Sequence, residues 1–192
     1  MDLLTALRSR RSIRRYTDRP VLPAVIDQLL EAATRAPSSH NSQPWRFVVI
    51  TTASVKAELA DRMGERLRAD RLRAADRVET IDRDVSRSRD RITSAPAIIV
   101  VCLSTIGLDD HHERLMAIQS VAASIQSLLL AAHEVGLGTC WMAAPLYCPD
   151  VVREVLRLSS DWDAQALITI GYPADEGKRR ERVDFHAKTI YR

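Results

Sequence analysis

Two apolar segments in the second half of the chain constrain the fold most strongly. Residues 97–103 (Ala-Ile-Ile-Val-Val-Cys-Leu) are apolar without interruption, which predicts a strand buried on both faces of a sheet. From Leu115 to Ala132 apolar residues recur at spacings of three and four, which predicts the longest helix of the chain, capped by Gly136. Small residues flank this stripe, so the helix suits either the protein core or a subunit interface.

The remaining elements follow from turn residues and apolar spacing. We expect short helices at residues 3–7 and after Pro149, and a helix from Pro23 that ends at Pro37. Residues 38–44 are then a loop, and the further strands are expected at 46–50, 138–144 and 166–172. This alternation predicts an α+β or α/β architecture in a single domain, residues 1–192. Gly136-Leu137-Gly138 lacks a third glycine and follows a helix, so the dinucleotide-binding fingerprint is not met.

Composition narrows the class of protein. The chain carries 28 Lys and Arg against 25 Asp and Glu, a near balance that argues against a nucleic-acid partner. No window of 18–20 uncharged apolar residues is evident, so we expect no membrane span, and the N-terminus has no signal-peptide pattern. Three cysteines without metal-like spacing fit a cytoplasmic protein without a metal site.

Residues 54–93 differ from the rest, because ten arginines alternate there with acidic residues and few apolar ones. The pattern predicts one or two exposed helices with i,i+4 ion pairs. Two interpretations stay open: a solvated excursion, or an arginine-rich lid over a ligand site that contacts an anionic substrate.

Two motifs carry the functional information. Residues 10–14 (Arg-Arg-Ser-Ile-Arg) place three guanidinium groups and a hydroxyl at the end of the first short helix. Residues 36–45 (Ala-Pro-Ser-Ser-His-Asn-Ser-Gln-Pro-Trp) form a run of small polar residues closed by proline and tryptophan. Taken alone, the first segment could be only a basic patch at a helix end, and the second could be only a turn. Together they suit an anionic, flat ligand with polar edges, since guanidinium binds phosphate and amides read ring carbonyls.

In these two motifs the chain resembles the FMN-dependent nitroreductase family. Its flavin-phosphate motif reads Arg-Arg/His-Ser, and its second motif reads Pro-Ser-Ser-x-Asn-x-Gln-Pro-Trp. The resemblance implies a nitroreductase-like α+β fold, a mixed central sheet wrapped by helices, and a homodimer with two flavin sites at the subunit interface. It also implies the cofactor FMN, NADH or NADPH as reductant, and a small-molecule acceptor.

The resemblance assigns roles residue by residue. Arg10, Arg11 and Ser12 would hold the FMN phosphate and ribityl chain, with Arg14 near the ring edge. The late phosphate-binding arginine would be Arg180. A backbone N–H of the strand at Trp141, Met142 and Ala143 would face the flavin N5, where it stabilises charge on the reduced ring. The partner subunit would contribute the second motif, that is Pro37, Ser38, Ser39, Asn41 and Gln43, with Arg35 close by.

Side-chain acid–base catalysis is not required by this chemistry, because the flavin carries the hydride. We therefore expect His133 to be a satisfied helix histidine, and Cys140 to be a small buried hydrophobe rather than a nucleophile. His111-His112 is expected at an exposed helix start.

Several functions remain open at this stage. The first is electron transfer from NAD(P)H through FMN to a nitroaromatic, quinone or conjugated acceptor. One branch of the family resembles the chain further: the flavin domain that forms the C-terminal half of the bifunctional deazaflavin-coenzyme biosynthesis protein, which implies reduction of an unsaturated coenzyme precursor. A flavin-consuming enzyme of the benzimidazole-forming type shares the motifs. A flavin-binding module that stores FMN without turnover is the alternative of another class.

Overall fold

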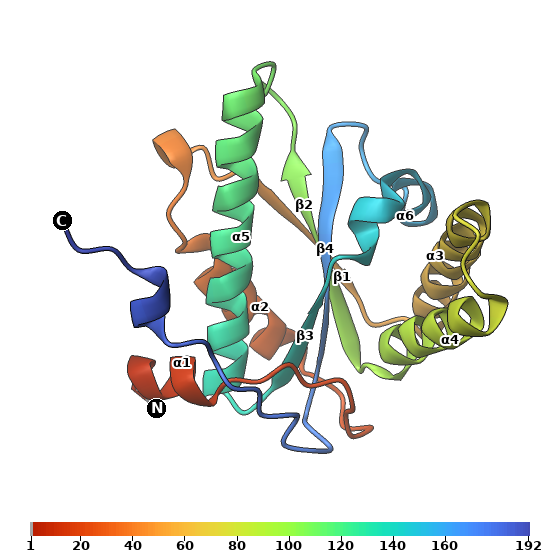
Figure 1. Cartoon of the computed structure of the whole chain (residues 1–192), viewed down its shortest axis with the longest axis horizontal. Helices are drawn as coiled ribbons and strands as arrows, with labels where there is room; N and C mark the ends of the chain where they lie inside the picture. The colour runs from red at the N-terminus through yellow and green to blue at the C-terminus, as the bar shows by residue number, and fades with distance from the viewer. Residues whose placement is uncertain (1) are drawn as a thin grey trace.

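The computed structural model describes residues 2–192 and contains a four-stranded sheet between two layers of helices (Figure 1). The strands are β1 (Trp45–Ile50), β2 (Ala97–Ser104), β3 (Gly138–Met142) and β4 (Trp162–Gly171), in the order β1-β2-β4-β3. This confirms the predicted α+β fold class.

The pairing within the sheet differs from the mixed sheet that we expected. All four strands pair antiparallel, and parallel pairing among residues 2–192 is confined to an isolated bridge between Ser12 and Thr139. The chain after the first helix runs beside β3 there, with the Ile13 N–H donating to the Thr139 carbonyl at 2.9 Å. The contact is too short to count as a fifth strand.

Strand β2 is buried on both faces, as its unbroken apolar sequence predicts. Ile99, Val101 and their same-face neighbours belong to one hydrophobic cluster, while Ile98 and Val100 belong to the other. The alternation follows from the two-residue period of a strand. Strand β4 begins at Trp162, earlier than the expected residue 166, because its first residues are only half-buried and include polar side chains.

Helices cover both faces of this sheet. On one side lie α1 (Leu3–Ser9), α2 (Pro23–Thr34) and α5 (His111–Glu134), and on the other lie α3 (Ala53–Arg73), α4 (Val78–Ser94) and α6 (Pro149–Leu156). Short 3₁₀ turns occupy η1 (Ser39–Asn41), η2 (Ala144–Tyr147) and η3 (Phe185–Lys188).

Helix α5 is the central helix of its layer. The Asp110 carboxylate caps it by accepting from the N–H groups of His112 and Glu113, and Gly136 ends it with a φ of 79°. By length and composition α5 could cross a membrane, which corrects our expectation that no such window exists. Its inward face nevertheless forms part of the core, with Val121, Ile125 and Leu128 almost fully buried.

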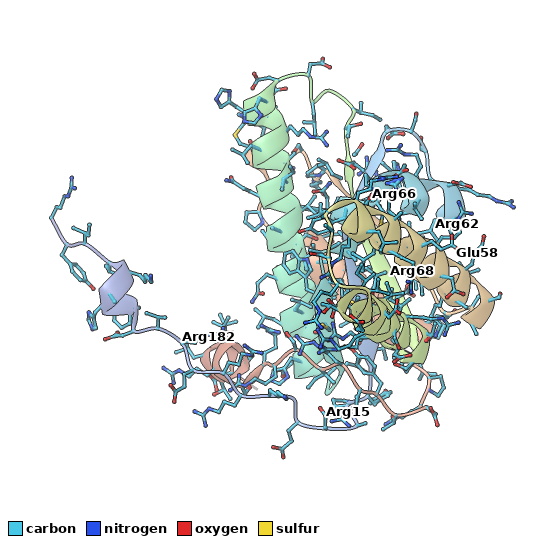
Figure 2. The ribbon with its side chains drawn as sticks, turned by 45° about the vertical axis from the view of Figure 1, so that its right-hand side comes forward. Arg15, Glu58, Arg62, Arg66, Arg68 and Arg182 are labelled. Carbon is cyan, nitrogen blue, oxygen red and sulfur yellow. The ribbon has the colours of Figure 1, made fainter. Side chains whose placement is uncertain are left out.

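Helices α3 and α4 form an antiparallel hairpin against α6, on the side of the sheet opposite α5 (Figures 1 and 2). Residues 54–93, for which the pattern predicted one or two exposed helices, form two. Their charges pair mainly between helices, rather than at the i,i+4 spacing that we expected. Arg68 pairs with Asp82 and Arg89 with Asp61 across the hairpin.

The chain beyond Gly177 lies outside the core. Residues 178–192 are exposed throughout, apart from the 3₁₀ turn η3 they form no regular element, and they run past α1 toward the C-terminus (Figure 1). Several of their side chains are apolar and still open to solvent, namely Val183, Phe185, Ile190 and Tyr191.

The close approach of β3 to the segment after α1 generates a test. A Cβ added at Gly138 would lie 2.6 Å from the Ile13 Cβ, so a Gly138→Ala substitution must displace one of the two segments. We expect the free energy of unfolding to fall by about 1–3 kcal/mol, as for other overpacked sites, in a denaturant titration.

Gly64→Ala is the matched control, because its added Cβ meets only Val85, at 3.0 Å, and gains helix propensity within α3. An unchanged stability of Gly138→Ala would contradict the packing described.

Candidate functional site

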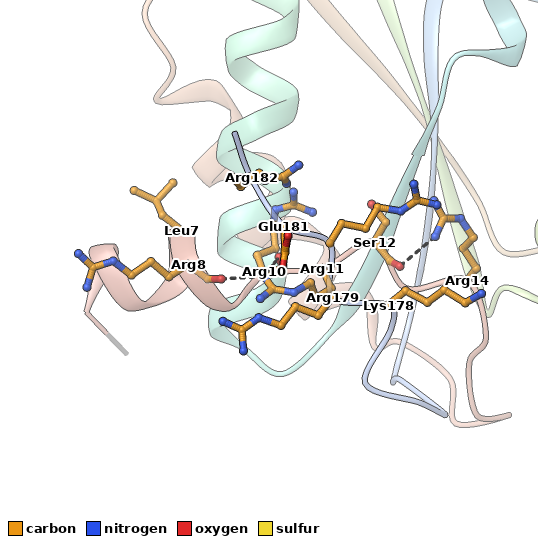
Figure 3. Close-up of a pocket in the computed structure, with 11 residues that line it drawn as sticks. Leu7, Arg8, Arg10, Arg11, Ser12, Arg14, Lys178, Arg179, Glu181 and Arg182 are labelled. Atoms are coloured by element: carbon orange, nitrogen blue, oxygen red, sulfur yellow. Dashed lines mark hydrogen bonds between the residues drawn. The ribbon is translucent and has the colours of Figure 1, made fainter. Parts of the chain in front are cut away.

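A cationic cavity of about 700 Å³ lies where the end of α1 meets the C-terminal segment (Figure 3). It brings together five of the residues predicted from the sequence: Arg10, Arg11, Ser12, Arg14 and Arg180. Sequence reasoning missed other residues of its lining, namely Leu7, Arg8, Lys178, Arg179, Glu181 and Arg182. The basic tail offered several registers, and only the fold shows that most of 178–182 faces the first motif.

The segment that carries the first motif is held firmly against the sheet. Ile13 is buried and its N–H bonds to β3, while the Tyr16 hydroxyl lies 2.7 Å from both the Ile13 carbonyl and the Thr169 hydroxyl. Burial raises the pKa of Tyr16 above its usual range, so this hydroxyl remains a hydrogen-bond donor. The backbone that carries Arg10 to Arg14 is therefore anchored at Ile13, and again at Tyr16 just beyond it.

Positive charge in this cavity is poorly compensated. Burial lowers the pKa of Arg10 below its ordinary value, and the neighbouring charges of Arg182 and Arg11 lower it further. Arg11 donates to the carbonyls of Arg8 and Arg10, at 2.7 Å each, and Glu181 is the one carboxylate among the lining residues. A bound anion would relieve this repulsion, so the geometry and charge fit a phosphate group.

His133 marks the place where the first motif meets α5. Its Nε2 lies 2.7 Å from the Ser9 hydroxyl, and burial together with Arg10 lowers its pKa below the usual value. The interaction supports our interpretation of His133 as a satisfied helix histidine.

The second motif adopts a constrained backbone. His40, Asn41 and Gln43 all have positive φ values, of 51°, 54° and 45°. Such conformations are costly for residues other than glycine, and they cluster at functional sites. The loop is held by hydrogen bonds: the N–H of Gln43 donates to the Ser38 hydroxyl at 3.1 Å, and the Gln43 amide donates to the Asn41 side chain at 3.2 Å.

The two motifs contact α5 at different levels, the second motif near the middle of the helix and the first at its C-terminal end. The Ser39 N–H donates to the Ser120 hydroxyl at 3.2 Å, whereas Ser9, next to Arg10, bonds to His133. Thirteen residues of helix separate these contacts, which corresponds to about 20 Å at the rise of an α-helix. One chain therefore does not bring its two motifs together.

The edge of β3 passes close to the first motif. The carbonyl of Thr139 accepts from Ile13, so it points away from β4. Backbone groups of alternate strand residues point the same way, and the N–H of Trp141 therefore faces the same edge. The Trp141 side chain is 41% exposed, while Met142 is buried in the core.

The other residues predicted for the second half of the site lie at the surface or near it. Arg35 pairs with Glu31 at 2.9 Å, Pro37 and Asn41 are exposed, and Ala143 is exposed at the end of β3. Cys140 is buried, as predicted. Burial also raises the pKa of Cys102 to about 12 and of Cys148 to about 11, so neither thiol is an activated nucleophile.

Comparison with known proteins places the chain in a family. The model described as "Nitroreductase family" matches residues 7–172. The "NADH dehydrogenase" of Thermus thermophilus is 30% identical over 223 residues, which cover the whole chain and 97% of that protein. A "Putative NADH dehydrogenase/NAD(P)H nitroreductase" of Methanothermobacter thermautotrophicus is 32% identical, over 96% of this chain and 84% of its own length.

Solved structures agree with this placement. A "BluB-like flavoprotein" of Clostridium difficile superposes with a TM-score of 0.86 at 23% identity, over 100% of this chain and 99% of its own. A "putative nitroreductase in complex with FMN" of Desulfovibrio desulfuricans has a TM-score of 0.76 at 28% identity, over 97% and 95%. The chain belongs to the nitroreductase family, and it is an oxidoreductase of that family.

Proposed function

We propose that this protein binds FMN and transfers electrons from NADH or NADPH to a small conjugated acceptor, such as a nitroaromatic or a quinone. The observation that carries the proposal is the cationic cavity at Arg10–Ser12, which opens beside the edge of β3. A phosphate bound in this cavity would leave the attached flavin within reach of the backbone N–H at the edge of β3. The family model and the FMN complex of the related nitroreductase support the same cofactor.

The residues of the first motif then have distinct tasks. Arg10, Arg11 and Ser12 hold the phosphate and ribityl chain, Arg180 adds a cation from the C-terminal segment, and Arg14 lies near the ring edge. FMN supplies the hydride chemistry when it is bound. The N–H of Trp141, at the edge of β3, would donate to the flavin N5 and so stabilise negative charge there. Met142 is buried at the end of that strand, and Ala143 follows it at the surface, where its backbone N–H would be the alternative donor.

The second motif belongs to the same site only in a homodimer. A two-fold axis perpendicular to α5 at about Gln126 would place the C-terminal end of one α5, at His133, beside the middle of the helix in the partner subunit, at the level of the contact with the second motif. That operation brings Arg10–Arg14 of one subunit to the loop Ser38–Gln43 of the partner subunit. Pro37, Ser38, Ser39, Asn41 and Gln43 would then complete the pocket around the ring, with Arg35 close by.

Helix α5 carries a surface that suits such pairing. One stripe of this helix faces away from the core and contains small, apolar and amide side chains without a charge: Leu115, Gln119, Ala122, Gln126 and Leu130. Leu115 remains 45% exposed in the single chain. The spacing of the stripe is close to a heptad, which favours helix-on-helix packing.

The identity of the electron acceptor is the open part of the proposal. A deazaflavin-coenzyme precursor as acceptor rests on the sequence resemblance alone.

We propose the cytoplasm as the location of the protein, because its three buried, unpaired cysteines fit a reducing compartment.

The proposal is tested by loading the protein with FMN, desalting it, and adding NADH or NADPH without oxygen. We expect a retained flavin absorption band that bleaches rapidly, because the site binds the cofactor and admits the reductant. A retained band that stays unbleached would favour the storage module or a different reductant. Loss of all flavin on desalting would contradict the proposal.

Arg10 provides a quantitative test of the phosphate site. We expect Arg10→Ala to weaken FMN binding by about 1.5–3 kcal/mol, the range for a hydrogen bond to a charged group, in fluorescence or calorimetric titrations. Arg73→Ala removes the same charge from the exposed end of α3 and serves as the control, with unchanged affinity. Equal affinity of Arg10→Ala and the native protein would refute the role of Arg10.

The dimer is tested at the centre of α5. We expect Ala122→Arg to yield a monomer in light-scattering chromatography and to lose FMN, because it removes the second motif from the pocket. Ala53→Arg, at the exposed start of α3 in the opposite helical layer, should change neither property. A monomeric Ala122→Arg protein with native FMN affinity would show that one chain suffices.

A further inference from the structure

Two arginines of the α3–α4 hairpin are set apart from the other eight. Within residues 54–93 each of those eight lies within 4 Å of a carboxylate on the hairpin or on α6: Arg62, Arg66, Arg68, Arg71, Arg73, Arg77, Arg83 and Arg89. Arg87 and Arg91 have no such partner among the described residues. Arg87 and Arg91 are therefore the arginines of residues 54–93 whose charge no described carboxylate within 4 Å offsets.

Asp84, a carboxylate that interacts electrostatically with Arg87, is already engaged by another arginine. The pKa of Asp84 lies below its ordinary value chiefly because Arg71 donates to it, at 2.6 Å, and Arg87 adds only a smaller effect. Asp84 is thus held by Arg71 on the hairpin, and Arg87 has no carboxylate of its own within 4 Å among the described residues.

Arg87 and Arg91 meet other cations across a second cavity. They are one turn apart on α4, so they project on the same side of that helix. Both line a cavity of about 480 Å³, which we call the anion basin, between α4 and the segments around Arg15 and Lys178. The basin contains six cations, the others being Arg14, Arg15, Lys178 and Arg180.

Only two carboxylates line the basin, Asp175 and Glu176. Asp175 is paired with Arg15, at 2.9 Å, and it also accepts from the Gly177 N–H at 2.9 Å. Most of the positive charge therefore stays uncompensated. Crowded like charges destabilise a fold, so an anion bound in the basin would relieve this repulsion.

The anion basin adjoins the cavity that we assign to the flavin. Four residues line both cavities, namely Ser12, Arg14, Lys178 and Arg180. A group held by Arg87 and Arg91 would consequently sit beside the cofactor, on the side of the α3–α4 hairpin.

We propose that Arg87 and Arg91 bind a phosphate group of a substrate and so determine which substrates reach the flavin. This inference rests on the proposed function, and it adds an anionic substrate class to it. Two guanidinium groups one turn apart can both donate charge-assisted hydrogen bonds to one phosphate. The phosphate has two sources: the reductant, since NADPH carries one more phosphate than NADH, or a phosphorylated acceptor.

The first experiment measures anion binding directly, without turnover. Inorganic pyrophosphate is titrated calorimetrically into the FMN-loaded protein, so that the flavin occupies its own phosphate site. We expect Arg87→Ala with Arg91→Ala to weaken pyrophosphate binding about tenfold or more, as for the loss of charge-assisted hydrogen bonds. Arg77→Ala, at the exposed start of α4, removes one charge outside the basin and should bind as the native protein does.

The second experiment identifies the source of the phosphate by steady-state kinetics. A KM for NADPH that rises about tenfold in the double variant, with the KM for NADH and kcat unchanged, assigns the phosphate to the reductant. The acceptor is tested with nitrophenyl phosphate against uncharged nitrobenzyl alcohol, and a KM that rises for the phosphate alone assigns it there. Arg87→Lys with Arg91→Lys should restore part of the affinity, since the charge is kept and the planar fork is lost.

The failures of the two proposals are distinguishable. A double variant that retains FMN and bleaches normally, but binds pyrophosphate as tightly as the native protein, overturns the anion basin and leaves the proposed function intact. A double variant that releases FMN on desalting also overturns it, because the two arginines would then belong to the cofactor site. If the native protein does not retain FMN, the proposed function fails, and the pyrophosphate titration on the flavin-free protein still decides whether Arg87 and Arg91 hold an anion.

Discussion

Burial of β2 and β4 on both faces is the constraint on which the rest of the structure depends. A strand with Ile98 and Val100 toward one side and Ile99 and Val101 toward the other needs an apolar cover on each. Helices α2 and α5 supply one cover, and α6 with the α3–α4 hairpin supplies the other. Gly138 lets Ile13 approach the edge of β3, and the cationic cavity forms where the segment that carries Ile13 meets the C-terminal segment.

The candidate site shows how one long helix can divide a function between two chains. Helix α5 contacts one motif near its middle and the other at its C-terminal end, and its outward stripe has no charge to oppose contact with a copy of itself. The strained loop at His40–Gln43 is held by hydrogen bonds to Ser38, and Ser39 beside it donates to Ser120 of α5. The backbone of such a loop is already ordered before a ligand binds, so less conformational entropy is lost on binding.

The fold class and most secondary-structure elements could be predicted from the sequence, because the spacing of apolar residues and the positions of turn residues are local signals. The strand at residues 97–103, the long helix with Gly136 after it, and the two arginine-rich helices were all confirmed. The early part of β4 was missed because Asp163 there is polar and pairs with Arg114. The mixed sheet was wrong, since strand direction depends on how distant segments meet. Pairing of the hairpin arginines likewise depends on tertiary neighbours, so no sequence pattern could single out Arg87 and Arg91. The roles given to the site residues stay predictions.

The exposed C-terminal segment has a consequence for how cofactor binding and chain order are linked. Arg180 and Arg182 line the cationic cavity, yet residues 178–192 rest on no core of their own. A ligand that engages these arginines must also restrict the backbone that carries them, and the loss of conformational entropy reduces its affinity. By the same linkage the ligand protects this segment, so resistance of the tail to a protease would report occupancy of the cavity. A domain fused to the C-terminus would therefore change both the affinity for the ligand and the protease resistance of residues 178–192.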